Sequence, residues 1–198
     1  MGHPYLRSTA ELDVSTQVWI DALKKPMVIV IAGLPGAGKT TLARELLRRR
    51  TWSYLSRDDI RAALFQPCAF TAEEREAGFR ALLIGLEASL VLGRTCVVEG
   101  MPFSRLGELE TVVSIADECG AHVQTFLVEV DSATAARRVA TESTAGRGRP
   151  DALDRTPELV QSVASRMRGF DESVIRLDGR VNPVALADLV LTRLGELG

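Results

Sequence analysis

Short apolar runs alternate along this chain with longer segments in which apolar residues recur every three or four positions. Runs of strand length occupy five stretches, at 27–32, 52–56, 95–99, 122–130 and 174–177. Helical spacing or helix-start residues predict helices over about 39–50, 59–65, 71–92, 104–119 and 132–142, with two more beginning at 157 and 182. Strands and helices therefore alternate, which predicts an α/β domain whose parallel sheet is covered by helices on both faces.

Several predicted helix starts carry residues that are typical of helix caps. Thr71 and Glu74 stand three positions apart and form a predicted capping box. Ser132 is expected to cap the helix over 132–142, and Asn182 is followed by Pro183 at the first helical position. These residues locate the helix starts independently of the apolar spacing.

The 198 residues are enough for one domain with a small appendage. We expect residues 1–25 to be a separate N-terminal segment that contains a helix over 11–23, because apolar residues recur there at helical spacing before Pro26. Residues 26–198 then form the main domain. Within it, the stretch 144–157 is rich in Gly, Arg, Pro and Asp, and we expect it to form a mobile lid.

The segment after the first apolar run matches the phosphate-binding pattern G-x-x-x-x-G-K-[ST] in full. It reads Gly33-Leu34-Pro35-Gly36-Ala37-Gly38-Lys39-Thr40 and lies between a predicted strand and a predicted helix, which is the context that this motif requires. Glycines let backbone N–H groups converge on a phosphate, and the helix N-terminus adds positive charge. The residues expected to bind the nucleotide are Gly33, Gly36, Ala37, Gly38, Lys39, Thr40 and Thr41.

The two residues that end this motif have distinct expected roles. Lys39 is expected to reach the β- and γ-phosphates, and the Thr40 hydroxyl is expected to bind Mg²⁺. The chain has three lysines and none follows Lys39, so the Asn/Thr-Lys-x-Asp segment with which GTPases read guanine is not present downstream. This composition disfavours a GTPase of the signalling kind.

Composition narrows the remaining classes of function. A formal net charge of -2 argues against a large surface for nucleic acid or membranes, although a local basic pocket stays compatible with it. No run is long and apolar enough to span a bilayer, and no signal-peptide pattern precedes the domain. Three distant cysteines predict reduced thiols and a cytoplasmic protein. With only two histidines, any general base is expected to be a carboxylate.

Acidic and basic residues follow the second predicted strand, at the edge where ligands of parallel sheets bind. Asp58 is predicted to be the general base that takes a proton from an attacking hydroxyl. Arg61 follows three residues later on the same side, where it would hold the base or the acceptor. The alternative is structural: Asp58 would cap the next helix, a role worth about 1 kcal/mol, and Arg61 would lie on the surface.

Glu99 places a charge at the end of an otherwise apolar strand, where a residue of this kind usually has a partner. Together with Thr40 it is expected to hold Mg²⁺, in part through water, or else to bind the acceptor. Contact with solvent at the strand end is the alternative. Met101 and Phe103 are candidates for lining an acceptor pocket, and core packing is the equal alternative.

Arginines flank or fill the predicted lid. They are Arg137, Arg138, Arg147 and Arg149, and at least one of them is expected to reach the transferring phosphate when the lid closes. Arg138 and Arg147 are the two named as catalytic candidates. A solvated surface position is the alternative for each.

These pieces together resemble the P-loop kinases that include polynucleotide 5′-hydroxyl kinases, chloramphenicol phosphotransferase and zeta-toxin-type sugar-nucleotide kinases. The resemblance rests on the loop through Thr41, the segment Arg57-Asp58-Asp59-Ile60-Arg61, the strand ending in Glu99-Gly100 and the arginine-bearing region, and spans about 27–150. It implies a three-layer fold with sheet order 2-3-1-4-5, and ATP with Mg²⁺. The polynucleotide kinases imply that Asp58 is the base and that Arg61 contacts the acceptor. The stretch Gly100-Met101-Pro102-Phe103 is more apolar than theirs and closer to the small-molecule and zeta-type pattern.

Three functions follow from this resemblance and from the composition. The first is an ATP-dependent phosphotransferase that acts on a hydroxyl of a small molecule such as an antibiotic, nucleoside or sugar. The second is a polynucleotide 5′-hydroxyl kinase. An aromatic content of 5% offers few side chains on which nucleotide bases could stack. The third is a P-loop ATPase or switch without an acceptor. The sequence does not name the acceptor or the oligomeric state.

Overall fold

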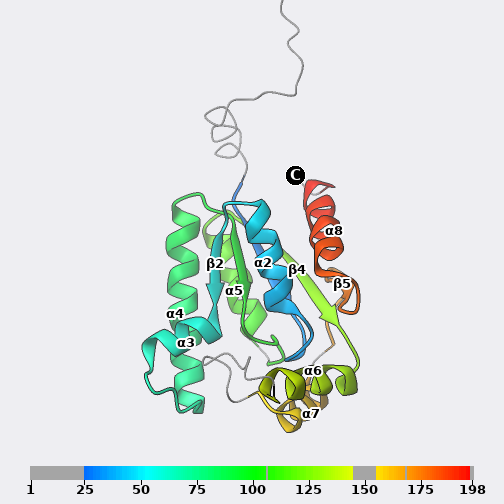
Figure 1. The fold of residues 1–198 in the computed structure, drawn as a ribbon. Coiled ribbons are helices and arrows are strands. Elements are labelled where there is room, and N and C mark those ends of the chain that lie inside the picture. The colour runs from blue at the N-terminus through cyan, green and yellow to red at the C-terminus, as the bar shows by residue number, and fades with distance from the viewer. Residues whose placement is uncertain (1–24, 106, 145–154, 168, 197–198) are drawn as a thin grey trace, which may run out of the picture.

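The computed structural model describes residues 25–105, 107–144, 155–167 and 169–196. The predicted N-terminal helix, Arg147, Arg149 and most of the predicted lid lie outside these residues. The described chain forms an α/β fold in which strands and helices alternate (Figure 1).

Each predicted strand has a counterpart in the described chain. The strands are β1 (Met27–Ala32), β2 (Ser53–Ser56), β3 (Cys96–Glu99), β4 (His122–Glu129) and β5 (Ile175–Asp178). The helices are α2 (Lys39–Arg49), α3 (Arg57–Leu64), α4 (Ala72–Val91), α5 (Glu108–Glu118), α6 (Ser132–Thr144), α7 (Pro157–Arg166) and α8 (Pro183–Glu196).

The strands form one parallel sheet in the order β2-β3-β1-β4-β5, which confirms the predicted order. β1 is the central strand, and its Ile29 pairs with Val97 of β3 and Gln124 of β4. Because all strands run the same way, their carboxyl ends meet at one edge. The phosphate-binding loop, α6 and α7 lie at that edge (Figure 1).

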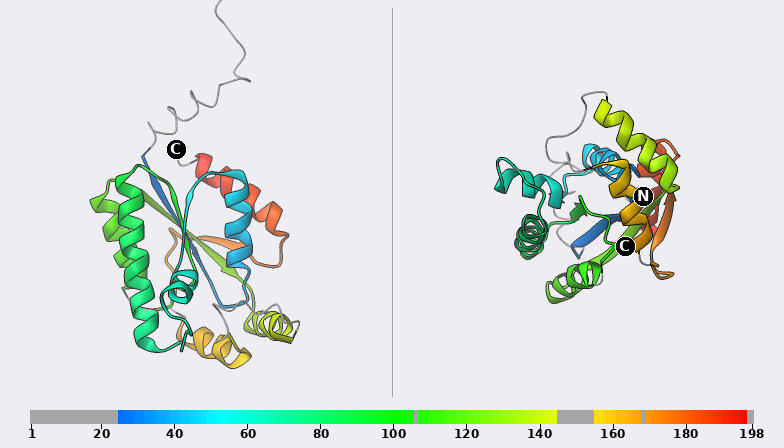
Figure 2. Two further views of the ribbon diagram at one scale, coloured as in Figure 1. Left: turned by 60° about the vertical axis from the view of Figure 1, so that its left-hand side comes forward. Right: turned by 90° about the horizontal axis from the view of Figure 1, so that it is seen from below.

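Side chains of β1 alternate between two apolar clusters, as expected for a strand buried on both faces. Ile29 and Ile31 pack with residues of α2, α6, α7 and α8. Val28 and Val30 pack with residues of α4 and α5 on the opposite face. Helices therefore cover both faces and give three layers, and Figure 2 shows α2 and α8 on one side of the sheet with α4 and α5 on the other.

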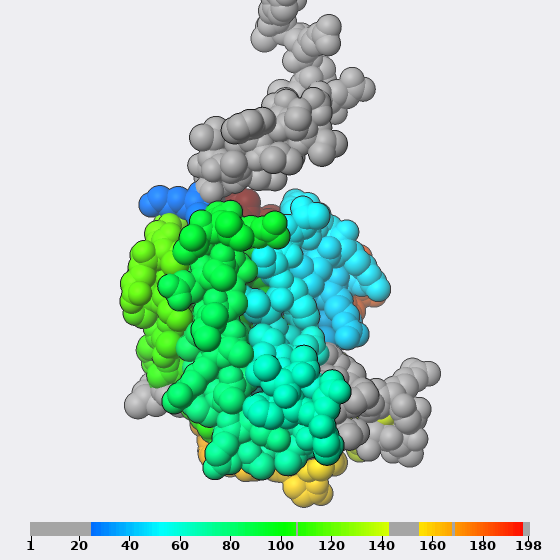
Figure 3. All heavy atoms as spheres, turned by 90° about the vertical axis from the view of Figure 1, so that its left-hand side faces the viewer, coloured from blue at the N-terminus to red at the C-terminus, as the bar shows by residue number. Residues whose placement is uncertain are grey.

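Helix α3 lies against the long helix α4, and both are seen on one face of the molecule (Figure 3). The predicted capping box starts α4: the Thr71 hydroxyl accepts from the Glu74 N–H, and the Glu74 carboxylate accepts from the Thr71 N–H. Gly78 lies at the crossing, since a Cβ there would come within 3.2 Å of Arg61 Cβ.

Three helix starts differ from the prediction. Helix α5 begins at Glu108 and not at 104, because Gly107 has φ 88 and its N–H donates to the Glu110 carboxylate. Helix α6 is capped by Asp131, which accepts from the Thr134 N–H at 2.7 Å, and the proposed cap Ser132 is its first residue. Helix α3 begins two residues before the predicted position, with consequences for the site.

None of the helices within the described residues is both long and apolar enough to cross a membrane. Cys68, Cys96 and Cys119 are free cysteines, in agreement with the expectation of reduced thiols.

Candidate active site

The phosphate-binding loop leads from β1 into the N-terminus of α2. Gly38 is the residue before the helix and has φ 107, a left-handed conformation that favours glycine. A Cβ at Gly38 would meet nothing within 4 Å, so the loop is open at this point. The first backbone N–H groups of α2 have no partner within the helix, and together with the helix dipole they favour an anion. The local geometry therefore suits a phosphate.

Lys39 is held by its own loop. Its Nζ donates to the carbonyl oxygens of Gly33 and Leu34 at 2.8 and 2.9 Å. Burial and, after it, the positive charge of Arg155 lower the pKa of Lys39 to about 8. An incoming phosphate would bring a further negative charge to this ammonium group.

Thr40, Glu99 and Tyr54 form a hydrogen-bonded group beside the loop. The Thr40 hydroxyl donates to Glu99 Oε2 at 3.1 Å, and the Tyr54 hydroxyl donates to Glu99 Oε1 at 2.5 Å. Glu99 is fully buried. Burial and the charge of Glu99 raise the pKa of the Tyr54 hydroxyl, which keeps it a donor at neutral pH. Glu99 therefore faces the loop and not solvent.

The residues present suit Mg²⁺ through oxygen donors. The hydroxyl of Thr40 and the carboxylate of Glu99 are hard ligands, and Mg²⁺ is bound in nucleotide sites by one or two protein groups plus phosphates and waters. No group of three or more His, Cys, Asp or Glu side chains that could hold a metal is found within the described residues. A metal at this place would therefore depend on the nucleotide.

Asp58 lies in the first turn of α3 and is surrounded by three guanidinium groups. Arg155, Arg57 and Arg61 approach its carboxylate at 2.8, 3.2 and 3.7 Å. Burial raises the pKa of Asp58, but the three positive charges outweigh burial and hold the pKa below its ordinary value. The helix is capped by Ser56, whose hydroxyl accepts from the Asp59 N–H. The capping role weighed as the alternative for Asp58 therefore belongs to Ser56.

Gly100 brings the end of β3 close to the start of α3. It has φ 86, and a Cβ there would lie 2.7 Å from Ser56 Oγ and 2.9 Å from the Asp58 N atom. Glycine is therefore required at this position for two reasons, the backbone angle and the space. This contact keeps the two predicted acidic residues, which follow different strands, at one edge.

Arg61 is buried and not on the surface, since it is 1% exposed. Its guanidinium stacks over the ring of Phe70 at 4.6 Å and lies 3.7 Å from Asp58 Oδ1. This position favours the interpretation that Arg61 holds the base. Direct contact with an acceptor stays a prediction.

Met101 and Phe103 lie in the core between the sheet and helices α4 and α5. They are 1% and 3% exposed. Of the two alternatives given for these residues, their burial favours core packing over an acceptor pocket. The segment between them is tied to the phosphate-binding loop, because the Gly33 N–H donates to the Pro102 carbonyl at 3.4 Å.

Arg138 of α6 binds the outer side of the loop. Its guanidinium donates to the carbonyl oxygens of Gly36, Ala37 and Gly179 at 3.0 to 3.4 Å. It thereby joins the loop to the segment before α8. The arrangement favours a role in holding the loop, and a catalytic role for Arg138 stays a prediction.

A polar cavity of about 300 Å³ opens over the loop. Its lining residues are Gly36, Gly38, Lys39, Thr40, Thr41, Arg138, Glu142, Arg155, Gly179, Arg180, Val181, Asn182 and Pro183. The lining is basic around the motif and lies at the N-terminus of α2. These are the features expected of a site for a nucleotide and its phosphates.

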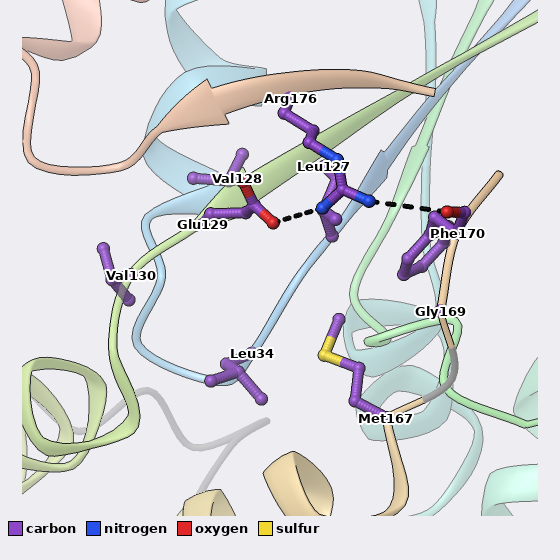
Figure 4. A pocket seen from close by; sticks show the side chains of 9 residues that line it. All are labelled: Leu34, Leu127, Val128, Glu129, Val130, Met167, Gly169, Phe170 and Arg176. Carbon is purple, nitrogen blue, oxygen red and sulfur yellow. Dashed lines mark hydrogen bonds and ion pairs between the residues drawn. The ribbon is translucent and has the colours of Figure 1, made fainter. Parts of the chain in front are cut away.

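A second cavity, of about 210 Å³, lies beside the carboxyl end of β4 (Figure 4). Its walls include Leu34, Leu127, Met167 and Phe170, and it contains none of the charged residues of the motif. An ion pair between Arg176 and Glu129 lies along one side (Figure 4). The largely apolar lining does not suit a phosphate.

Two site residues were not predicted from the sequence. Tyr54 lies in the short strand β2, and no motif or residue spacing in the sequence distinguishes it as a site residue. Arg155 lies inside the predicted lid range 144–157, but the prediction singled out other arginines near it. A signal for Arg155 was present, because it immediately precedes Thr156, which caps α7 and so fixes that part of the chain.

The fold and the loop together define a P-loop nucleotide-binding protein. The AAA domain family (AAA_33) matches residues 28–167, well over half of the chain, so the chain belongs to that family. It is 32% identical over 130 residues to UPF0200 protein PAE1629 of Pyrobaculum aerophilum, covering 63% of this chain and 68% of that protein.

Solved structures share the fold. A candidate kinase from Chloroflexus aurantiacus J-10-fl matches 85% of this chain and 98% of its own, with a TM-score of 0.69 and 18% identity. The Mycobacterium tuberculosis APS kinase CysC, in complex with AMPPNP and APS, matches 86% of this chain and 98% of its own, with a TM-score of 0.61 and 18% identity. At these identities the similarity concerns the fold alone. The fold is thus one found in kinases.

Proposed function

We propose that this protein is an ATP-dependent phosphotransferase that moves the γ-phosphate to a hydroxyl of a small molecule. The observation that carries the proposal is the position of Arg155. It lines the same cavity as Lys39 and Thr40, and it pairs with Asp58 at 2.8 Å. A candidate base therefore adjoins the place where the loop would bind a triphosphate.

In this proposal the loop binds and orients the triphosphate. Backbone N–H groups at the start of α2 and the Lys39 ammonium group neutralise phosphate oxygens. Thr40 and Glu99 would hold Mg²⁺, which would neutralise part of the negative charge of the phosphates. Arg155 leaves Asp58 and turns to the transferring phosphate, so that it serves as the arginine that the lid was expected to supply.

Asp58 is the general base of the proposed reaction. The lowered pKa keeps its carboxylate ionised at neutral pH, so it is ready to accept a proton. The acceptor oxygen bonds to the γ-phosphorus, the bond from that phosphorus to the bridging oxygen of ADP breaks, and the hydroxyl proton passes to Asp58. Departure of Arg155 removes one positive charge and makes Asp58 a stronger base at that moment.

A small acceptor fits the charge balance of the chain best. A net charge of -2 counts against a large binding surface for a polyanion. Structures of the same fold include a sugar kinase from Janibacter sp. HTCC2649, with a TM-score of 0.64, and a gluconokinase from Sinorhizobium meliloti 1021, with a TM-score of 0.62. These similarities support a small hydroxyl compound as the acceptor class.

A polynucleotide 5′-hydroxyl kinase is the second candidate. The approach of Arg61 to Asp58 at 3.7 Å, one helical turn apart, favours it. A chain of the Pnkp1/Rnl/Hen1 RNA repair complex also shares the fold, with a TM-score of 0.56 over 75% of this chain. In this alternative, Arg61 would act on a phosphate of the acceptor as well as on the base.

The test is transfer of labelled γ-phosphate from ATP to 5′-hydroxyl oligonucleotides and, separately, to a panel of sugars, nucleosides and antibiotics. We expect transfer to a small acceptor, and we expect the Lys39→Ala variant to lose it by at least about a thousandfold. Transfer to the oligonucleotide alone would favour the second candidate. Hydrolysis of ATP that no acceptor stimulates would contradict both and indicate an ATPase or switch.

A further inference from the structure

We infer that Tyr54 is a positioning residue for the magnesium-binding carboxylate Glu99. This inference rests on the proposed function, because it assigns a role toward a metal that would be bound together with the nucleotide. Tyr54 would not touch the metal or the phosphates. It would act through Glu99, by fixing the direction in which that carboxylate presents its charge.

The hydrogen bonds define the arrangement. Tyr54 donates to one oxygen of Glu99 at 2.5 Å, and Thr40 donates to the other at 3.1 Å. Each carboxylate oxygen thus has one donor, and the side chain has little freedom to rotate. Both donors are neutral hydroxyl groups, so these two hydrogen bonds orient Glu99 without cancelling its negative charge.

The two donors are not equivalent once a metal binds. The Thr40 hydroxyl is itself an expected ligand, and its oxygen must turn a lone pair to the metal. The hydrogen bond from Tyr54 involves no atom of the phosphate-binding loop. It can therefore persist through nucleotide binding, metal binding and product release, and hold Glu99 in place throughout.

The parallel register explains why a tyrosine reaches this carboxylate. Ser56 of β2 is paired with Glu99 of β3, so Tyr54 lies two positions before the residue opposite Glu99. Two residues of a strand span about 6.6 Å, which is about the length of a phenol side chain. Phenylalanine at position 54 would fill the same space and lack the donor. The hydroxyl is therefore the part of the side chain that the carboxylate uses.

Tyr54→Phe separates this role from packing. Binding of a non-hydrolysable ATP analogue is measured by calorimetry in excess EDTA and over a Mg²⁺ titration. We expect the Mg²⁺ concentration for half-maximal enhancement to rise about tenfold, at the lower end of the range seen when a group behind a metal ligand is lost. Affinity in EDTA should stay within about twofold of the wild type. Trp52→Phe, which changes an aromatic side chain packed on the same face of the sheet, should leave both values unchanged.

The outcomes distinguish the inference from the proposed function. A wild-type protein that binds the analogue with no response to Mg²⁺ contradicts the proposed metal site and the role of Tyr54 with it. A wild-type response to Mg²⁺ that Tyr54→Phe reproduces unchanged overturns the inference alone. Equal weakening in EDTA and in Mg²⁺ would show a merely structural role for Tyr54 and would also overturn it.

Discussion

Glu99 and Asp58 are both buried carboxylates at the carboxyl edge of the sheet, yet their partners are opposite in kind. Glu99 is the last residue of β3 and accepts from two neutral hydroxyl groups. Asp58 follows β2 and is met by three guanidinium groups. Neither carboxylate is free to solvent, so the difference lies in charge compensation and not in exposure.

The comparison shows that one edge of a sheet can hold two carboxylates whose surroundings suit them to different roles. A buried carboxylate with neutral donors keeps a net negative charge, which suits it to attract a cation. A carboxylate surrounded by arginines is held ionised, and its basicity then depends on whether those arginines stay. The following predictions test this contrast between a metal-directed and a proton-directed carboxylate.

The largest effect is expected from Asp58→Asn. The amide retains the shape but loses the negative charge and one acceptor oxygen, and it cannot accept a proton, so turnover should fall at least about a hundredfold. Nucleotide affinity measured by calorimetry should change by less than about threefold. Asp59→Asn, one residue further along α3, is the matched control and should retain near-normal turnover. An active Asp58→Asn enzyme would remove the base assignment.

Glu99→Gln should show the opposite profile. Loss of the negative charge should raise the Mg²⁺ concentration needed for half-maximal nucleotide binding about tenfold to a hundredfold. Binding without metal should be unchanged or slightly stronger, because the amide no longer repels the phosphates. Calorimetry with and without Mg²⁺ measures both quantities. Equal responses of the Asp58 and Glu99 variants to Mg²⁺ would erase the contrast between the two carboxylates.

Lys39 gives a pH dependence with a definite sign. Its pKa of about 8 means that the ammonium group loses its proton as the pH rises past 8. A bound triphosphate favours the charged form, so binding should take up a proton above pH 8 and weaken about tenfold between pH 7 and pH 9. Calorimetry in buffers of different ionisation enthalpy measures the proton uptake. Lys39→Arg stays charged and should give a flat profile, whereas a flat wild-type profile would contradict the prediction.

Fold stability should depend on the contact between Gly100 and the start of α3, which keeps the two carboxylates at one edge. Gly100→Ala should lower the free energy of unfolding by about 2 kcal/mol more than Gly93→Ala does. Both glycines have positive φ, but a Cβ at Gly93 meets nothing within 4 Å, whereas a Cβ at Gly100 meets Ser56 and α3. Chemical denaturation measures the difference. Equal losses would mean that only the backbone angle matters at Gly100.

Much of the fold follows from the apolar pattern. β1 reads as an apolar, largely β-branched run because it is buried on both faces, and helix α4 begins where its capping box stands. The strand order came from the resemblance of the loop and its neighbours to kinases. The start of α5 was missed because Gly107 outweighs the helical spacing of the residues before it.

The candidate site was partly predictable for a physical reason. Asp58 and Glu99 are polar residues at strand ends, and Lys39 belongs to the phosphate-binding motif that follows β1, so their positions in sequence already place them at one edge. Tyr54 and Arg155 gain their partners only through tertiary contacts, across 45 and 97 residues. The burial of Met101 and Phe103 favours core packing over a pocket wall. The sequence could not distinguish these two positions, because apolar residues occur in both.

The separation of Asp58 from Arg155 has a consequence for the growing polypeptide. The ribosome adds about 5–20 residues each second, so the acid is made roughly 5 to 20 seconds before the arginine that pairs with it at 2.8 Å. Of the three arginines that pair with Asp58 in the described structure, Arg57 and Arg61 are already made in that interval. The ion pair between Asp58 and Arg155 can therefore form only late in synthesis of the chain. A fragment that ends before Arg155 would lack this ion pair.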